Sequence, residues 1–461
     1  MDTKYENGLF IFRRDLRIID NNGLNLLNSR CKNIYTIFIF TPEQVGTNNK
    51  YKSNNAVQFM IESLEDLSRQ IKKQDGHLYT FYGNNNKVII DCIKAFNIDV
   101  VCFNLDITPY AKERDLSIIK LCEKMKINII NDYDYYLNEP GTILNGAGEP
   151  YQKFTPYYQT ASRKKVQSPI GKKKLNLRGS NVHITNRISL NEAMNRFTKV
   201  NSNILVHGGR EEAIKQIKIA SKNIKYYSKT RDDLSKSTSQ LSAYIKFGNI
   251  SIREVYYSFK SKHDFIRQLY WREFYSEILY NFPRVLGHAL KPKYDKIRWH
   301  YNERWFNAWC NGNTGFPVVD AGMRQLNTTG YMENRARLIT MSFLVKTLLI
   351  DWRYGEKFFA TKLTDYDPAS NNGNIQWISG SGADSQQYMR IFNPFTQAKE
   401  HDENCEYIKT WVPELKNVDN NIILNWETEW EKNKNIKYPK PIVNYSEQRK
   451  KALEMYSKAL Y

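Results

Sequence analysis

The sequence has few cysteines and histidines for its length. Its 461 residues include six cysteines and seven histidines. No cysteines form a CxxC pair and no histidines stand at ligand spacing, so neither a zinc site nor a disulfide framework is predicted. No apolar run approaches the ~20 residues needed to span a bilayer, and the opening MDTKYENG lacks the apolar core of a secretory signal. We therefore expect an intracellular protein without a membrane segment.

Negative charge is also scarce. Asp and Glu number 48 against 68 Lys and Arg, which leaves a net charge of +20. Self-repulsion of this size favours a polyanionic partner, most often nucleic acid, with solubility alone as the alternative. The length and the 41% hydrophobic content predict two or three globular domains.

The first 135 residues alternate short apolar runs with helical patterns. We expect strands at 8–12, 33–40, 77–82, 99–104 and 126–131. This alternation predicts an α/β domain over residues 1–140, built on a parallel five-stranded, Rossmann-like sheet that would bind ligands at the carboxyl ends of its strands. The chain has no GxGxxG and no GxxxxGK[ST], which argues against an ordinary dinucleotide or triphosphate site at the first turn.

The remaining chain divides into two parts. Residues 141–206 are rich in Lys, Ser, Asn and Pro and predict a basic interdomain connector on the surface. Residues 207–461 show helical periodicity almost throughout and predict an all-α domain.

One predicted helix carries an unusual polar and aromatic face. Gln268, Trp271, Arg272 and Tyr275 fall at i, i+3, i+4 and i+7, so they share one side of the helix. A helical tryptophan is usually a core residue, but an amide and a cation beside it are not what a dry core selects. The face is a candidate binding surface.

A second set of polar residues follows further along the chain. Asn334 and Arg337 share a helix face, and Arg335 points elsewhere, free to reach a phosphate. Asp365 and Asp367 are suitable partners for Arg337. A structural ion pair is the alternative, and a DxD metal site is the weakest reading because no third carboxylate supports it.

Two further segments fit a flat, phosphorylated ligand. The hydroxyls of Thr238, Ser239 and Ser242 precede a helix and suit either a pyrophosphate or a simple N-cap. The stretch from Thr364 to Gly382 is predicted as a glycine-rich loop, in which Asn371 offers hydrogen bonds and Trp377 a stacking surface.

Several long motifs resemble the photolyase/cryptochrome family, and the chain is most like a class I-type cyclobutane pyrimidine dimer photolyase. They cover nearly the whole chain in order: FRRDLRIIDN, WREFY, GNTGFPVVDAGMRQLNTTGYMENRARLITMSFLVK, DYDPASNNGN and RIFNPFTQAKEHDENCEYIKTWVPEL. The resemblance implies an α/β antenna domain and a helical domain that binds FAD. It also implies that light excites reduced FAD, which passes an electron to a pyrimidine dimer in UV-damaged DNA and splits it.

The resemblance assigns roles to individual residues. Asn371 would face flavin N5, where its neutral amide adds no negative charge beside the reduced flavin. The remaining FAD-binding residues would be Tyr227, Thr238, Ser239, Leu241, Ser242, Asn334, Arg337, Asp365 and Asp367. Trp271 and Trp377 would stack on a dimer flipped out of the duplex, Gln268 would touch it, and Arg272, Arg335 and Arg390 would hold DNA phosphates.

Three departures from the family pattern limit these roles. Ile375 stands where members carry the flavin-proximal tryptophan of an electron relay, whose other members would be Trp352 and Trp309. Gln268 replaces a glutamate common in cyclobutane-dimer enzymes, and (6-4) photolyases also use glutamine there. The histidines that (6-4) enzymes need are absent, because Glu333, Asn334 and Leu338 occupy that segment. We therefore favour the cyclobutane dimer.

Three function classes remain to be compared. The leading hypothesis is a light-driven DNA repair lyase, expected to be a monomer located with DNA in the cytoplasm or nucleus. A (6-4) photolyase or a cryptochrome-type blue-light photoreceptor is the alternative, and a flavin-free basic DNA-binding protein is the third. A second, antenna chromophore (a folate or a deazaflavin) is expected, but no motif identifies it.

Overall fold

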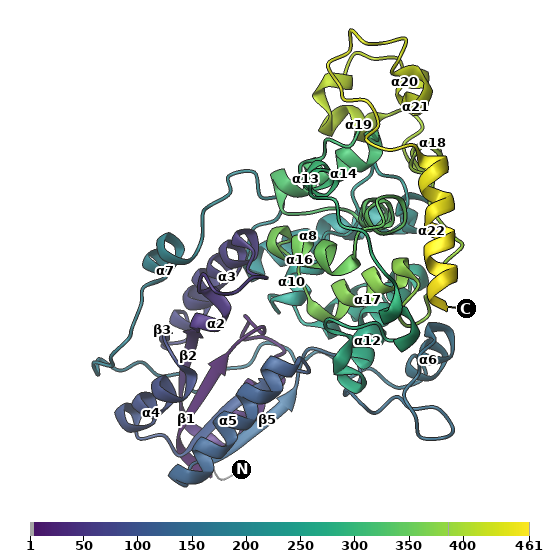
Figure 1. Ribbon diagram of the computed structural model, residues 1–461. Coiled ribbons are helices and arrows are strands. Elements are labelled where there is room, and N and C mark those ends of the chain that lie inside the picture. The colour runs from purple at the N-terminus through teal and green to yellow at the C-terminus, as the bar shows by residue number, and fades with distance from the viewer. Residues whose placement is uncertain (1–3, 386, 461) are drawn as a thin grey trace.

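A parallel five-stranded sheet forms the centre of the N-terminal half in the computed structural model, which describes residues 4–385 and 387–460 (Figure 1). Its strand order is β3-β2-β1-β4-β5, and every pairing is parallel. The sequence predicted this sheet correctly. The strands are β1 (Tyr5–Phe12), β2 (Cys31–Phe40), β3 (Leu78–Tyr82), β4 (Val100–Leu105) and β5 (Asn128–Tyr133).

Helices cover both faces of the sheet. Alternate residues of β1 enter different cores: Phe10 and Phe12 pack towards α1 and α3, whereas Leu9 and Ile11 pack towards α4 and α5. Burial on both faces explains why these strands read as continuous apolar runs rather than alternating ones. The helices of this half are α1 (Asn22–Asn28), α2 (Pro42–Val45), α3 (Asn54–Lys72), α4 (Asn85–Phe96) and α5 (Pro109–Met125).

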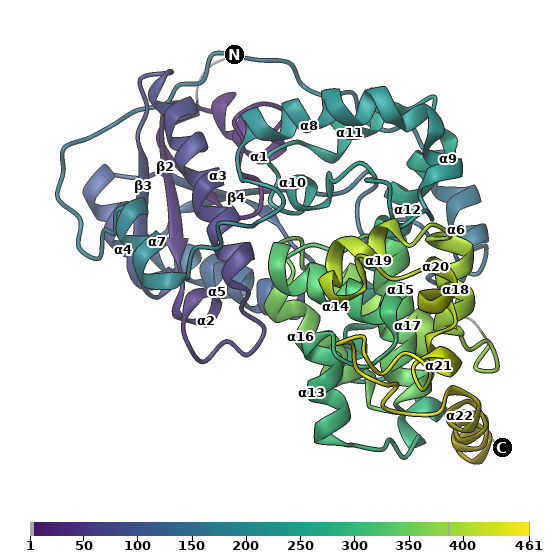
Figure 2. The same ribbon diagram turned by 90° about the horizontal axis from the view of Figure 1, so that it is seen from above.

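The predicted connector contains two helices, α6 (Phe154–Ala161) and α7 (Leu190–Phe197). Between them the chain crosses from α6 on one side of the view in Figure 2 to α7 on the other. Single bridges join it to the sheet, at Leu177 beside Ile34 and at Arg187 beside Phe81. The boundaries 1–140, 141–206 and 207–461 stay predictions.

The second half of the chain is helical, as predicted. Its last helix lies against a short π-helical turn at Phe343–Thr347. Its α-helices are α8 (Arg210–Asn223), α9 (Tyr227–Thr230), α10 (Ser242–Lys246), α11 (Ile252–Phe259), α12 (His263–Asn281), α13 (Glu303–Asn311), α14 (Pro317–Thr329), α15 (Asn334–Ser342), α16 (Trp352–Lys362), α17 (Pro368–Ser379), α18 (Pro394–His401), α19 (Glu406–Trp411), α20 (Asn420–Leu424), α21 (Trp426–Glu429) and α22 (Tyr445–Leu460).

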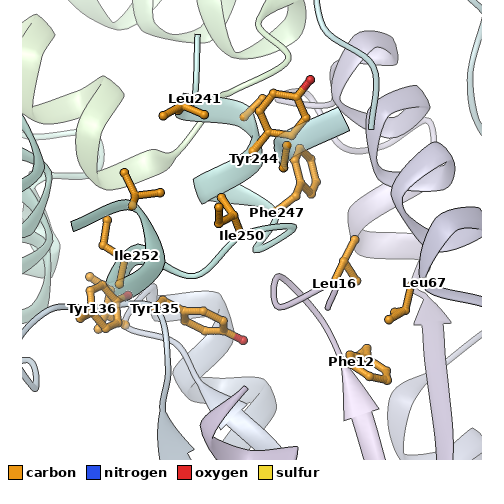
Figure 3. Packing of buried hydrophobic residues seen from close by; sticks show 14 of the residues in the cluster. Phe12, Leu16, Leu67, Tyr135, Tyr136, Leu241, Tyr244, Phe247, Ile250 and Ile252 are labelled. Carbon is orange, nitrogen blue, oxygen red and sulfur yellow. The ribbon is translucent and has the colours of Figure 1, made fainter. Parts of the chain in front are cut away.

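One apolar core runs from the sheet into the helical half. Phe12 and Leu67 of the α/β half and Tyr244, Phe247 and Ile252 of the helical half belong to a single buried cluster (Figure 3). Burial of such side chains contributes roughly 1.5–3 kcal/mol each, so the two halves stabilise one another.

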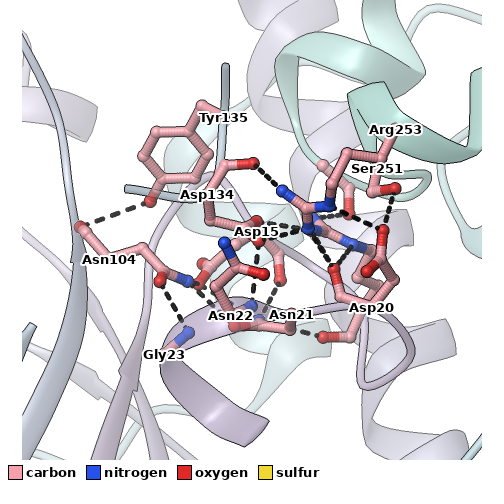
Figure 4. A network of polar contacts seen from close by, with 12 residues as sticks. Asp15, Asp20, Asn21, Asn22, Gly23, Asn104, Asp134, Tyr135, Ser251 and Arg253 are labelled. Carbon is pink, nitrogen blue, oxygen red and sulfur yellow. Dashed lines mark hydrogen bonds and ion pairs between the residues drawn. The ribbon is translucent and has the colours of Figure 1, made fainter. Parts of the chain in front are cut away.

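A buried polar network lies beside this core (Figure 4). Arg253 of α11 donates to Asp20 at 3.0 Å and to Asp134 at 2.8 Å, and Arg17 also pairs with Asp134. All four side chains are at most 3% exposed. Arg17, Asp20 and Asp134 belong to the α/β half, so Arg253 is the residue of the helical half that joins this network.

Candidate functional site

Helix α17 corrects one prediction. The stretch from Thr364 to Gly382 is mostly helical, not a loop. Asp367 is its N-cap and accepts a hydrogen bond from Ser370 N at 3.0 Å, and Pro368 fills the first helical position. An Asp-Pro pair at a helix start is a recognised sequence signal, which the glycine and asparagine content obscured.

Helices α12 and α17 pack closely, and a glycine allows it. A Cβ atom built on Gly373 would lie 2.1 Å from Cδ1 of Tyr275. Tyr275 is buried, so its ring has no space to move aside. This contact fixes the spacing of the two helices that carry Trp271 and Trp377.

Both tryptophans are half-buried. The Trp271 ring stacks on Phe154 of α6, with ring centroids 3.7 Å apart and planes at 5°, and lies 5.6 Å from the Tyr275 ring. Gln268, one turn earlier, donates its amide to Asp264 O at 3.2 Å. Trp271 and Tyr275 lie side by side as predicted, and Phe154, a connector residue that sequence reasoning missed, stacks on Trp271. Ligand binding by this face stays a prediction.

Arg272 does not point the same way. Its guanidinium donates to Tyr135 O at 2.9 Å and pairs with Glu273 at 2.8 Å. Arg335 is likewise engaged, with Asp232 at 2.8 Å. Arg390 is exposed and has no carboxylate within 4.0 Å among the described residues. Phosphate contact by Arg272 and Arg335 stays a prediction, and both would have to leave an ion pair to make it.

Asn371 lies over a buried acid. Its amide is 3.5 Å from Glu356 O, and Asn372 donates to Glu356 Oε1 at 3.2 Å. Burial raises the pKa of Glu356 to about 7, although the hydrogen bond from Asn372 opposes the shift. Sequence reasoning missed Glu356, and the signal was available: a lone acid on a helix among Trp352, Phe359 and Ala360.

Part of the predicted FAD-binding set meets around Asp365. This carboxylate accepts from Ser242 Oγ at 2.7 Å and from Arg337 Nη2 at 2.8 Å. Thr238 Oγ1 donates to a carboxylate oxygen of Glu333 at 2.7 Å. Gln240, two residues after Thr238, has a positive φ of 51°. A strained non-glycine residue is typical of ligand clamps.

The rest of this set is spread along the chain from Tyr227 to Asp367. Tyr227 of α9 packs edge-on against Phe265, and burial raises the pKa of its phenol to about 12. Leu241 is buried, Ser239 is half-buried, and Asn334 is exposed at the start of α15. Asp367 pairs with Arg14 at 3.0 Å; burial alone would raise its pKa, but Arg14 and Arg272 bring it below the usual value.

Comparison with known proteins decides the family. Residues 9–173 match the family model described as DNA photolyase, and residues 265–458 match the FAD binding domain of DNA photolyase. The chain belongs to the DNA photolyase family. A deoxyribodipyrimidine photo-lyase of Alkalihalophilus pseudofirmus is 34% identical, with 96% of each chain covered.

Solved photolyase structures share the whole fold. An archaeal photolyase from Sulfolobus tokodaii with two FAD molecules has a TM-score of 0.88 and 39% identity, covering 98% of this chain and 100% of the other. A bacterial class III photolyase from Agrobacterium tumefaciens has a TM-score of 0.91 and 29% identity, covering 100% and 98%. The helical half is thus the FAD-binding domain of a photolyase, as the sequence predicted.

The three predicted electron-relay positions are buried. Ile375 is 4% exposed, Trp352 1% and Trp309 0%, all within one core cluster. Trp309 donates its ring N–H to Thr340 O at 2.9 Å, and its ring contacts are with phenylalanines. No ring contact joins it to Trp352 within the described part of the chain, and neither tryptophan reaches solvent. The relay role of both stays a prediction.

A second site lies between the α/β half and the helical half. This cavity of about 300 Å³ opens at the carboxyl ends of the strands, where ligands of such sheets bind. Its walls carry the cations Arg13, Arg14, Lys52, Arg114 and Lys246 but the single carboxylate Asp106.

The cationic wall of this cavity has spare hydrogen-bond donors. Among the described residues, Arg13 Nη2, Arg14 Nε and Arg114 Nη2 are buried and make no hydrogen bond, although other nitrogens of these side chains pair with Asp115 and Asp367. Lys246 Nζ lies over the Phe247 ring at 3.6 Å, and burial lowers its pKa to about 7. These groups would suit a ligand with an anionic end.

Proposed function

We propose that this chain is a light-driven DNA repair lyase that splits cyclobutane pyrimidine dimers. Family membership makes light-dependent repair its activity. The observation that carries the repair proposal is the pair of half-buried tryptophans on helices held together at Tyr275 and Gly373, with Asn371 on the same helix as Trp377.

The residues around Asp365 fit an FAD molecule. Hydroxyls of Thr238, Ser239 and Ser242 suit the diphosphate, and Asp365 and Asp367 suit hydroxyl or amine groups of the ribose and adenine. Tyr227, Leu241, Asn334 and Arg337 complete the proposed set. When bound, reduced FAD supplies the excited electron that the reaction needs.

The protein's own groups position the substrate and hold the cofactor's charge. Trp271 and Trp377 would stack on the flipped dimer, worth about 1–3 kcal/mol per base, which offsets the few kcal/mol that flipping costs. Gln268 would hydrogen-bond thymine carbonyls. Asn371 would accept from flavin N5–H, and the buried Glu356 beneath it keeps that amide in place.

The cyclobutane dimer is favoured over the (6-4) product. Proton transfer to a (6-4) adduct needs a group that titrates near neutrality. The segment that would supply it holds Glu333, Asn334 and Leu338. Glu333 is buried and accepts from Thr238, so it faces the cofactor set and not the lesion. Membership in class I stays a prediction.

A second chromophore is proposed for the cavity between the domains. Its cationic wall and spare arginine donors suit a phosphorylated or otherwise anionic heteroaromatic molecule. The archaeal photolyase from Sulfolobus tokodaii holds two FAD molecules, described as implying a novel light-harvesting cofactor, which supports a second chromophore here. Whether it is a folate or a deazaflavin stays open.

The proposed partner is UV-damaged DNA, bound by a monomer inside the cell. No described helix is both long enough and apolar enough to cross a bilayer. Arg390, which is exposed, is proposed as a phosphate contact.

The deciding experiment uses two lesions. The FAD-loaded protein is reduced without oxygen and given blue light with oligonucleotides holding either a cyclobutane thymine dimer or a (6-4) product. Loss of the cyclobutane dimer alone is expected. Loss of the (6-4) product alone would overturn the lesion assignment, and loss of neither with reduced FAD bound would favour a photoreceptor.

A further inference from the structure

Positive charge is concentrated in the connector. Residues 141–206 contain eleven Lys and Arg but only two acidic residues, Glu149 and Glu192. Their net charge of +9 is almost half of the +20 of the chain, although they are 66 of 461 residues. The densest part, which we call the basic strip, consists of Arg163, Lys164, Lys165, Lys172, Lys173, Lys174 and Arg178.

The structure does not neutralise this charge. None of the eleven cations has a carboxylate oxygen within 4.0 Å among the described residues, whereas buried arginines elsewhere, such as Arg210 with Glu254 at 2.7 Å, are paired. Lys164 donates to Thr142 O and Arg178 to Asn33 Oδ1, which are neutral acceptors. The side chains of the strip are exposed. Unpaired like charges repel, so folding alone does not explain them.

The backbone of the strip is fixed, unlike that of a flexible linker. Val166, Leu175 and Leu177 are buried anchors, each at most 4% exposed. Ile170 N donates to Asp20 Oδ1 at 2.7 Å, and Tyr257 OH donates to Val166 O at 2.8 Å. The lysines of the basic strip therefore project from a backbone segment that is held against the protein surface.

The basic strip begins next to the helix that contributes to the proposed lesion site. Arg163 follows α6 directly, and α6 supplies the Phe154 ring that stacks on Trp271. Eleven residues separate Arg163 from Lys174, a reach of at most about 40 Å at 3.3–3.6 Å per residue. One turn of duplex DNA is about 34–36 Å long, so the strip can follow roughly a full turn of duplex flanking the lesion.

We propose that the basic strip is a second, sequence-independent contact with the phosphates of duplex DNA beside the lesion. This proposal rests on the proposed function only for where the DNA lies, because the strip leads away from the pocket proposed for the damaged bases. Lysine ammonium groups on a fixed backbone suit phosphate oxygens, which position a duplex without reading its sequence. The expected gain is affinity for long DNA, with a strong salt dependence.

The test removes charge from the full-length, FAD-loaded protein. The variant K172Q/K173Q/K174Q is compared with a control, K94Q/K120Q/K124Q, which changes the same charge at exposed positions on α4 and α5. Dark binding is measured against salt for a 40-base-pair duplex with one cyclobutane dimer and for an eight-nucleotide strand with the same lesion. Thermal unfolding checks that both variants fold.

For the strip variant and the long duplex, the slope of log K against log [salt] should be smaller in magnitude by about two to three. At 0.1 M salt this variant should bind the long duplex about ten- to a hundredfold more weakly than the wild type. The control should match the wild type, and both variants should bind and repair the short strand normally. An unchanged slope on the long duplex, or an equal loss on the short strand, would overturn the proposal. If the wild type repairs no lesion but the slope still falls, the strip survives and the proposed function fails.

Discussion

The contact between Gly373 and Tyr275 gives the sharpest prediction. Replacing Gly373 by alanine adds one methyl group where no atom fits, because Tyr275 Cδ1 lies 2.1 Å from the new Cβ position. In an exposed helix the same change would stabilise the protein, since alanine is about 0.5–1 kcal/mol better than glycine inside a helix. A loss of stability in G373A would therefore report the contact with Tyr275, because helix propensity alone would make this variant more stable.

The size of the effect follows from the geometry. A carbon–carbon contact is comfortable at about 3.5–4.0 Å, so α12 and α17 must separate by more than one ångström or Tyr275 must leave its rotamer. Overpacking of this kind costs typically about 1–3 kcal/mol, and the intrinsic gain of alanine offsets part of it. We expect G373A to lower the free energy of unfolding by about 0.5–2 kcal/mol. It should also weaken dark binding of a dimer-containing oligonucleotide, because Trp271 and Trp377 move apart.

A double-mutant cycle separates this contact from other effects. Free energies of unfolding are measured in urea for the wild type, G373A, Y275A and the double variant. Y275A opens the space that the new methyl group needs, so G373A should cost little in that background. G171A is the matched control, because a Cβ at Gly171 meets nothing within 4 Å. Equal costs of G373A in both backgrounds, or a stabilised single variant, would refute the reasoning.

Three further predictions concern single buried residues. I375W should speed light-driven reduction of bound FAD, which flavin absorbance under anaerobic blue light measures. It should also lower the free energy of unfolding by about 1–3 kcal/mol, since a larger ring enters a closed core. An unchanged rate of reduction would contradict the relay. The Glu356 pKa of about 7 lies above its ordinary value, so ionisation between pH 4.5 and 7 destabilises the fold by about 3 kcal/mol. E356Q should therefore lose less stability than the wild type between pH 5 and pH 8 in urea melts, and equal losses would show that Glu356 does not titrate in this range. R253M strands two buried carboxylates and should cost about 3–5 kcal/mol, whereas K32M breaks an exposed pair and should leave the melting temperature unchanged; a similarly stable R253M would contradict the role of the network.

The sheet was predictable because its signal is local. The central strands are buried on both faces and the helices between them have an apolar side, so the period changes visibly along the chain. The pairing of Arg337 with Asp365 was also predictable in part, since the carboxylates of Asp365 and Asp367 both suit a guanidinium. Both follow from what a folded chain does with residues it must bury.

The missed features depend on contacts distant in sequence. Helix α17 was read as a loop because Asn371 and Gly373 are poor helix formers, yet Tyr275 from another helix selects that glycine. Phe154 was overlooked because it stands in a polar connector, and only the fold brings it to Trp271. Arg272 looked available for phosphate because no pattern in the sequence shows that Glu273 and Tyr135 O hold it.

The network of Arg17, Asp20, Asp134 and Arg253 has a consequence for the integrity of the molecule. Arg17, Asp20 and Asp134 precede the connector and Arg253 follows it, so the network joins the two halves without using the covalent link between them. A protease that nicks the exposed lysines of the basic strip should leave a complex that stays associated through gel filtration, and the fragments should come apart only when the chain is denatured.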